Sequence, residues 1–418
     1  MHVATAVFLA ALVLTTVTRL WLASRHARHV AANRDAVPLE FAGRISAEAH
    51  RKAADYTAAK TRLGALETLV SATVLLGLTL GGGLELLSEI AGRVFTPGGH
   101  AHGMALITSV IVVLSLLDLP FDLYRTFAIE ARFGFNRTSL ALFLADLAKQ
   151  TAIGALLGLP LVFCVLWLMA GMGELWWLYV WVTWVAFNLV VMVVYPIVIA
   201  PLFNRFSPLE DADLRSRIEA LLAKCGFRSR GLFVMDNSKR SSHGNAYFTG
   251  FGAAKRIVLF DTLISRLAPV EVEAVLAHEL GHFSLHHVWK RTALLFGASL
   301  AFLWALAWLM GHDWFYASLG VRSQSTVMAL VLFFLVAPVF SFLLRPIATL
   351  YSRRHEFEAD AFAARHADAR DLAGALVKLY QDNAATLTPD PLHSAFFDSH
   401  PPALQRIARL ETHKPAEA

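Results

Sequence analysis

Seven long apolar stretches constrain this chain more than any other feature. A helix needs about 20 mostly apolar residues to cross the hydrocarbon core of a membrane. Stretches of this kind occur at about 3–23, 63–91, 102–121, 151–172, 174–203, 292–311 and 326–350. Charged residues make up only 17% of the chain, against about a quarter in soluble domains. The sequence therefore predicts a mainly α-helical, multi-pass membrane protein and excludes a wholly soluble, disordered or disulfide-stapled chain.

Basic residues between these stretches indicate the orientation in the membrane. The first connection carries eight Lys and Arg residues, whereas the second carries only Arg93. Because cytoplasmic connections are enriched in Lys and Arg, we expect the N-terminus outside, and the odd-numbered connections and the C-terminus inside. The net charge of +5 is explained by this pattern, so the lipid bilayer is an expected partner and nucleic acid is not.

Two segments have a more polar, soluble character, at about 204–291 and 351–418. Neither is long enough for a large core of its own, so we expect them to pack together as one split domain. Its first part has helical periodicity at 211–222 and short strand patterns at 231–235 and 256–260. A turn leading into a strand is predicted at 243–250. The domain boundary is accordingly placed at 203/204.

The first soluble segment contains His278-Glu-Leu-Gly-His282, within a stretch whose helical pattern runs from Glu271 to His287. On a helix His278 and His282 lie one turn apart on one face, where two imidazoles can bind one metal ion. Zinc suits this pattern, because a catalytic zinc site needs three protein ligands and one open position for water. Glu279 can then accept a proton from the zinc-activated water.

A third ligand is required, and the segment after the last apolar stretch offers candidates. Glu356 and Asp360 lie at i and i+4 on a predicted helix, so Glu356 can complete the metal site while Asp360 orients a ligand imidazole. His355 is a rival third ligand, and a solvated acidic face is the alternative explanation of the segment. Glu358 points away from Glu356, and we expect His286 and His287 to support the site without binding the metal.

Four motifs occur in order along the chain: 241–250 (SSHGNAYFTG), 278–282 (HELGH), 354–360 (RHEFEAD), and 399–402 (SHPP) followed by Arg406. With the seven spans, they closely resemble the CAAX prenyl protease type 1 family, integral-membrane zinc endopeptidases of the gluzincin class. The resemblance implies helices ringing a water-filled chamber, with a small α+β gluzincin-like zinc protease domain on the cytoplasmic side.

The resemblance also implies a role for eight side chains. They are the zinc ligands His278, His282 and Glu356, the general base Glu279, the orienting carboxylate Asp360, the substrate-positioning Asn245, and His400 and Arg406 near the scissile carbonyl. One Zn²⁺ ion per chain follows. Alternatives stay open for three of these residues: turn chemistry for Asn245, a turn cap for His400, and a helix-surface ion pair with Glu411 for Arg406.

The organisation that this resemblance implies is a five-helix membrane region at 1–203 and a metallopeptidase region at 204–418, which is split by spans at about 292–311 and 326–350. Short connections suggest a bacterial inner-membrane protein. The expected substrates are CAAX-type prenylated or other hydrophobic, membrane-associated peptides. The alternatives are an HtpX-like quality-control protease of misfolded membrane proteins, and a transporter with a structural metal site. A transporter would carry its metal-type residues within the spans, whereas here they fall in the soluble segments.

Overall fold

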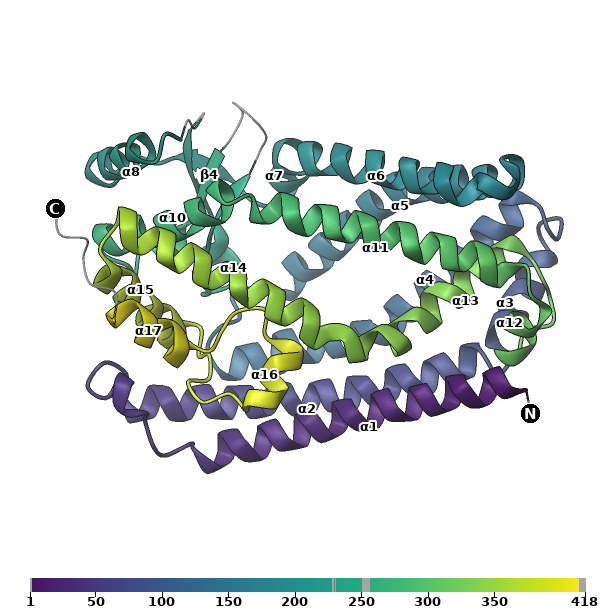
Figure 1. Cartoon of the computed structure of the whole chain (residues 1–418), viewed down its shortest axis with the longest axis horizontal. Helices are drawn as coiled ribbons and strands as arrows, with labels where there is room; N and C mark the ends of the chain where they lie inside the picture. Colours follow the sequence, from purple (N-terminus) through teal and green to yellow (C-terminus); the bar gives the residue numbers. More distant parts are fainter. Residues whose placement is uncertain (1, 228, 230, 250–255, 413–418) are drawn as a thin grey trace.

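The computed structural model describes residues 2–227, 229, 231–249 and 256–412. Seven of its helical segments are long and apolar enough to cross a membrane (Figure 1). Among the described residues these segments are Val3–Ala32, Ala47–Leu78, His100–Glu130, Leu140–Gly171, Gly173–Phe203, His287–Met310 and Thr326–His366. The prediction of a mainly α-helical protein with seven spans is confirmed.

The first half of the chain is almost entirely helical. Its helices are α1 (Val3–Ala32), α2 (Ala47–Leu78), α3 (Gly83–Gly92), α4 (His100–Tyr124), α5 (Leu140–Gly171), α6 (Trp176–Val194) and α7 (Ala200–Phe203). Wider π-helical turns extend α4 over Arg125–Glu130 and join α6 to α7 over Tyr195–Ile199.

The second half alternates between short soluble elements and two further spans. Its helices are α8 (Ala212–Lys224), α9 (Asp261–Ile264), α10 (Pro269–Ser284), α11 (His287–Met310), α12 (Asp313–Ser318), α13 (Thr326–Ser341), α14 (Arg345–His366), α15 (Ala369–Asp382), α16 (Pro391–Phe397) and α17 (Ala403–Glu411).

The second span differs from its predicted bounds of 63–91. Helix α2 begins at Ala47, where the Ser46 hydroxyl accepts a hydrogen bond from the Ala49 N–H at 3.1 Å, and it ends at Leu78. The chain then turns through Gly82, whose φ of +78° favours glycine, and α3 follows as a separate helix. A Cβ on Gly83 would lie 2.8 Å from the carbonyl oxygen of Gly77, so this turn needs glycine for space as well.

A four-stranded sheet with the order β1-β2-β4-β3 lies at one end of the molecule. Its strands are β1 (Phe206–Pro208), β2 (Leu232–Met235), β3 (Ala246–Thr249) and β4 (Arg256–Phe260). Strands β2 and β4 are parallel, and the other pairs are antiparallel, with Ala246 of β3 opposite Leu259 of β4. Strand β3 is therefore an edge strand. Gly250, the last residue of its sequence motif, lies outside the described residues.

The small sheet and its helices share one hydrophobic core. Ile257 and Leu259 of β4 are completely buried, as are Ile218 of α8 and Leu276 of α10, and all four belong to a single cluster. The predicted pairing of the two soluble segments is visible there, because buried Leu372 of α15 belongs to the same cluster. This split domain holds α10 and α14 beside each other.

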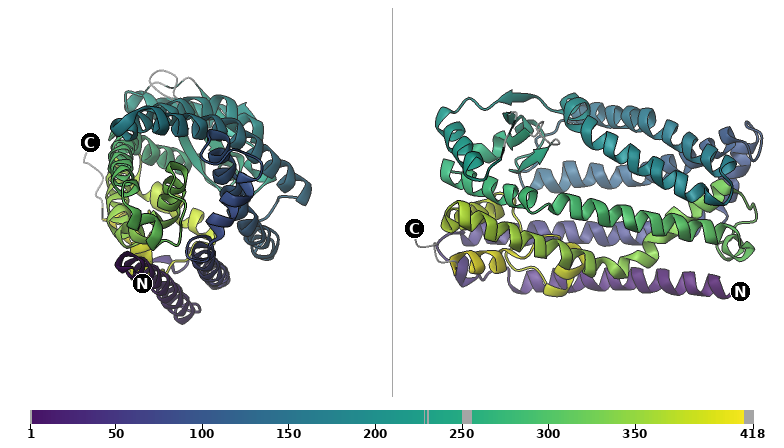
Figure 2. Two further views of the ribbon diagram at one scale, coloured as in Figure 1. Left: turned by 90° about the vertical axis from the view of Figure 1, so that its right-hand side faces the viewer. Right: turned by 45° about the horizontal axis from the view of Figure 1, so that its top comes forward.

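Viewed along the long axis, the helices are arranged around the perimeter of the molecule (Figure 2). The N-terminus and the sheet lie at opposite ends of this axis (Figure 1).

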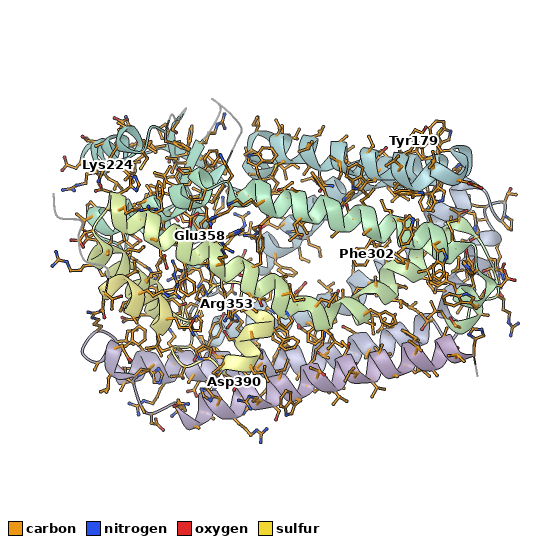
Figure 3. All side chains as sticks on the ribbon, in the orientation of Figure 1. Tyr179, Lys224, Phe302, Arg353, Glu358 and Asp390 are labelled. Carbon is orange, nitrogen blue, oxygen red and sulfur yellow. The ribbon has the colours of Figure 1, made fainter. Side chains whose placement is uncertain are left out.

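Polar contacts tie α16 to both α1 and α14, and two of the side chains involved, Arg353 and Asp390, are labelled in Figure 3. Asp390, at the start of α16, accepts a hydrogen bond from Arg25 of α1 at 2.8 Å. Arg353 of α14 donates to the hydroxyl of Ser394 at 2.7 Å. These contacts join the first span to the helix that carries the second metal-type motif.

Candidate active site

Helix α10, which carries His278 and His282, is fixed in the core by polar contacts at its first turn and by buried leucines. The Glu271 carboxylate accepts the Ala268 backbone N–H at 2.7 Å, which closes the first turn, and it also accepts from Lys378 of α15 at 2.7 Å. Leu276 and Leu280 are completely buried. The imidazoles on this helix are thus positioned by a rigid support.

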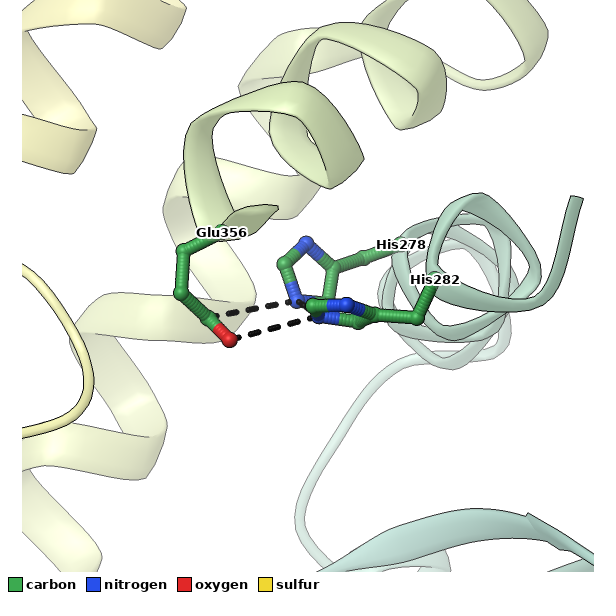
Figure 4. A group of neighbouring side chains, drawn as sticks. All are labelled: His278, His282 and Glu356. Carbon is green, nitrogen blue, oxygen red and sulfur yellow. Dashed lines mark hydrogen bonds and ion pairs between the residues drawn. The ribbon is translucent and has the colours of Figure 1, made fainter. Parts of the chain in front are cut away.

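Three side chains from α10 and α14 converge on one point (Figure 4). The Nε2 atoms of His278 and His282 lie 3.3 Å apart. Glu356 brings Oε2 to 3.6 Å from His278 Nε2 and Oε1 to 3.3 Å from His282 Nε2. One donor atom from each residue lies within 4.8 Å of the other two. Two imidazoles and one carboxylate are a donor set typical of catalytic zinc.

The burial of Glu356 shows that these residues fit a cation. The side chain is only 3% exposed, and among the described residues its Oε2 atom has no partner in hydrogen-bond geometry. His400 Nδ1 lies 2.7 Å from this atom, so it is a close polar neighbour of the buried carboxylate. A buried carboxylate is costly unless its charge is compensated, and a bound metal ion would add to that compensation. We infer that the three donors are arranged for a metal.

Asp360 and Arg406 lie behind His278. The Asp360 Oδ1 atom is 2.8 Å from His278 Nδ1, and Arg406 donates two hydrogen bonds to the same carboxylate, at 2.6 and 2.9 Å. Burial alone lowers the pKa of His278, but its contacts with Asp360 and Glu356 outweigh burial and raise the pKa to about 9. Asp360 therefore lies where it can orient a ligand imidazole.

Arg406 is almost completely buried beside the ligand cluster. Its side chain is 5% exposed, and its contacts are with Asp360, with His278 Nδ1 at 3.4 Å and with Glu356 at 3.6 Å. The alternative ion pair with Glu411 is absent among the described residues, since Glu411 pairs instead with Arg44 at 2.9 Å. The surrounding carboxylates raise the pKa of Arg406 against the effect of burial.

The other three predicted residues are more exposed than Arg406. Glu279 is partly buried and, within the described part of the chain, its carboxylate has no hydrogen bond or ion pair. His400 is largely exposed, with Nδ1 2.7 Å from Glu356 Oε2. Asn245 is exposed directly before the edge strand β3, and its Oδ1 accepts the Ala246 N–H at 2.8 Å.

The predicted uninterrupted helix from 271 to 287 is wrong. Helix α10 ends at Ser284, His286 adopts a left-handed φ of +57°, and α11 begins at His287. The break turns His287 inward, to 1% exposure, and leaves His286 exposed. The Nδ1 atoms of His282 and His287 lie 3.0 Å apart, a contact that helical spacing does not reveal.

His355, the rival third ligand, lies outside the ligand cluster. Its ring stacks on His287, with the ring centroids 4.0 Å apart. Glu358 follows on α14 and accepts from His287 Nε2 at 3.0 Å. This contact could not be predicted from the sequence, because its two residues are 71 positions apart along the chain.

Comparisons with known proteins agree with this geometry. Residues 26–205 match the family described as "CAAX prenyl protease N-terminal, five membrane helices", and residues 208–414 match "Peptidase family M48". The protein is thus a multi-pass membrane zinc metalloendopeptidase. A transporter is excluded as its class.

Individual relatives extend over nearly the whole chain. A CAAX prenyl protease 1 homolog from Arabidopsis thaliana is 35% identical over 384 residues, with 90% of each chain covered. The homolog from Homo sapiens is 32% identical over 456 residues, covering 98% of this chain and 96% of its own. The crystal structure of S. mikatae Ste24p superposes with a TM-score of 0.92 at 27% identity, covering 98% of this chain and all of the other. The chain therefore belongs to the CAAX prenyl protease type 1 family.

Proposed function

We propose that this protein cleaves CAAX-type prenylated or other hydrophobic peptides with one zinc ion held by His278, His282 and Glu356. The observation that carries the proposal is the convergence of one donor atom from each of these residues, with the Glu356 carboxylate almost completely buried. Zinc bound there would supply Lewis-acid activation of a peptide carbonyl and of water.

The surrounding side chains have the other catalytic and positioning roles. Glu279 accepts the proton of the attacking water and passes it to the leaving amine, for which its unpaired carboxylate is suited. Asp360 holds His278 through Nδ1, and Arg406 holds Asp360. Of the residues around the cluster, exposed His400 is the donor suited to stabilise charge on the carbonyl oxygen.

Substrate binding is assigned to the edge strand β3. An extended peptide can add to an exposed sheet edge through main-chain hydrogen bonds, and β3 follows Asn245 directly. Asn245 then positions the peptide beside the ligand cluster. The names of the relatives support a CAAX-type substrate, and degradation of misfolded membrane proteins is the competing assignment.

The exchange Glu279→Gln tests the chemistry, with Glu273→Gln on the same helix as the matched control. Glu273 is an ion-pair partner of Arg217 at 3.7 Å and not part of the cluster. We expect Glu279→Gln to keep zinc and lose activity by about 10²-fold or more, while the control keeps both. Full activity in zinc-loaded Glu279→Gln would overturn the assignment of Glu279 as the general base.

Paired peptides test the substrate class. A peptide ending in Cys-aliphatic-aliphatic-x is offered with and without a prenyl group, beside an unfolded membrane polypeptide. We expect faster cleavage of the prenylated peptide. Equal cleavage of all three would favour the quality-control assignment.

The proposal also includes a bacterial inner-membrane location, with the N-terminus outside and the zinc site on the cytoplasmic side. Single cysteines at His2 and at Glu411, in a chain from which Cys164 and Cys225 have been removed, test this orientation. A reagent that cannot cross the membrane should label only the first in intact cells. Labelling of only the cysteine at Glu411 would show that the orientation is the opposite one.

A further inference from the structure

The two predicted imidazole ligands have different supports. A ligating histidine usually gives its second ring nitrogen to a carboxylate, carbonyl or water, which fixes the tautomer and the ring orientation. His278 has Asp360 in this position, at 2.8 Å. His282 faces another imidazole instead, because His287 Nδ1 lies 3.0 Å from its Nδ1 atom.

The positions of the ring hydrogens on His282 and His287 define which of the two donates in this contact. If Nε2 of neutral His282 binds the metal, its hydrogen is on Nδ1, so Nδ1 must donate. His287 must then accept at Nδ1 and carry its own hydrogen on Nε2. The acceptor for that second hydrogen is present, because Glu358 Oε2 lies 3.0 Å from His287 Nε2.

We propose that His287 and Glu358 are positioning residues for the metal site, linked to it as a chain from His282 to His287 to Glu358. The chain holds His282 in the tautomer that leaves Nε2 free for the metal. The inference rests on the proposed metal site and adds to it a support for its second imidazole ligand.

The surroundings of His287 hold this chain in place. His287 is 1% exposed, and its ring lies parallel to that of His355, with an angle of 8° between them. Tyr351 packs edge-on against His355, with centroids 4.4 Å apart. Arg354 donates to Glu358 Oε1 at 2.9 Å, which leaves Oε2 for His287. Each group in the chain therefore has a single role.

His287, His355 and Glu358 could alternatively form a second metal site. One donor atom each from His287, His355 and Glu358 lie within 4.8 Å of one another. The geometry opposes this reading, because ring lone pairs lie in the ring plane, and two stacked parallel rings cannot both direct one at a single ion. An ion on His287 Nε2 would also leave a hydrogen on His287 Nδ1, facing the hydrogen of His282. The positioning role avoids both conflicts.

Zinc affinity of the purified full-length chain, measured by competition with a chromogenic chelator, tests the proposal. His287→Phe keeps a ring for stacking but has no acceptor, and His287→Asn keeps an acceptor close to the Nδ1 position. His286→Asn is the matched control, because this adjacent histidine is exposed and asparagine tolerates its left-handed φ of +57°. We expect about 10- to 100-fold weaker zinc binding in His287→Phe, substantial rescue in His287→Asn, and no change in the control.

Glu358→Gln gives a second variant that does not disturb the buried rings. It keeps an acceptor but removes the charge, so we expect a smaller loss of zinc affinity than in His287→Phe. The d–d spectrum of the cobalt-substituted protein should change in His287→Phe and return toward that of the wild type in His287→Asn. A purely structural role for His287 would not give this rescue.

Three outcomes would overturn the proposal: unchanged zinc affinity in both His287→Phe and Glu358→Gln, equal losses in His287→Phe and His287→Asn, or a fall from two zinc ions to one in His287→Phe. Failure of the proposed function is distinguishable, because zinc binding would then be unaffected by His278→Ala as well.

Discussion

Gly281 of α10 lies directly against the backbone of Ala359 in α14. A Cβ placed on Gly281 would be 3.0 Å from the Ala359 Cα atom, 3.1 Å from its carbonyl oxygen and 3.1 Å from the Cβ of Phe362. Glycine in a helix costs about 1 kcal/mol relative to alanine, and here it allows the two ligand-bearing helices to approach. The close approach brings the imidazoles of one helix to the carboxylate of the other.

Gly281→Ala should therefore damage the site although alanine favours helix. The new methyl group meets backbone atoms, which cannot move aside as a flexible side chain could, and overpacking of this kind costs about 1–3 kcal/mol. We expect a lower melting temperature and weaker zinc binding, measured by thermal unfolding and chelator competition. Gly297→Ala in α11 is the control, because no atom lies within 4 Å of that added Cβ. Equal stability of the two variants would contradict this explanation.

Arg406→Ala should destabilise the folded protein strongly. Removing one partner of a buried ion pair typically costs about 3–5 kcal/mol, because the other charge stays buried and unpaired. Here the buried Asp360 carboxylate would lose both hydrogen bonds from Arg406 and keep only its contact with His278. We expect thermal unfolding at a lower temperature together with weaker zinc binding. Arg409→Ala on the same helix should have little effect, since Arg409 is exposed and packs over the Phe357 ring. A stable, zinc-loaded but inactive Arg406→Ala protein would instead support direct contact of Arg406 with substrate.

Arg240→Met should loosen the connection between the membrane region and strand β3. Arg240 donates to both carboxylate oxygens of Asp146 in α5, at 2.8 and 3.0 Å, and to the Asn204 Oδ1 atom at 2.9 Å. It lies five residues before Asn245, so we expect KM to rise more than kcat falls, as measured with a peptide substrate. Arg205→Met, which removes an exposed arginine nearby, is the control. A change in kcat alone would contradict this prediction, because it would show that Arg240 affects the chemical step and not substrate binding.

Acid should weaken the contact between α1 and α16. Burial lowers the pKa of His393 to about 4, against the opposing influence of Asp390, and the ring stacks on that of His26. Below the ordinary histidine pKa of about 6.5 the unfolded chain takes up a proton that the folded chain resists. Stability should thus be constant above about pH 6.5 and fall from there toward pH 4. Melting temperatures across this range, compared with those of His393→Phe, should show a shallower fall in the variant; parallel curves would contradict the assignment.

Hydropathy and short motifs were sufficient to predict the seven spans, because each depends on residues close together in sequence. The spacing of His278 and His282 predicted a shared face for the same reason. The break at His286 was missed, since neither glycine nor proline marks it. The partners of Arg406 and Glu358 could not be predicted, because they depend on how α10, α11, α14 and α17 pack. The division at 203/204 stays a prediction, as do the roles of the individual site residues.

Anomalous diffraction from crystals of the zinc-loaded protein, collected at the zinc absorption edge, tests the central claim most directly. We expect one strong peak per chain, at about 2.0–2.2 Å from His278 Nε2, His282 Nε2 and a Glu356 carboxylate oxygen. A peak among His287, His355 and Glu358 with none at the first cluster would contradict it.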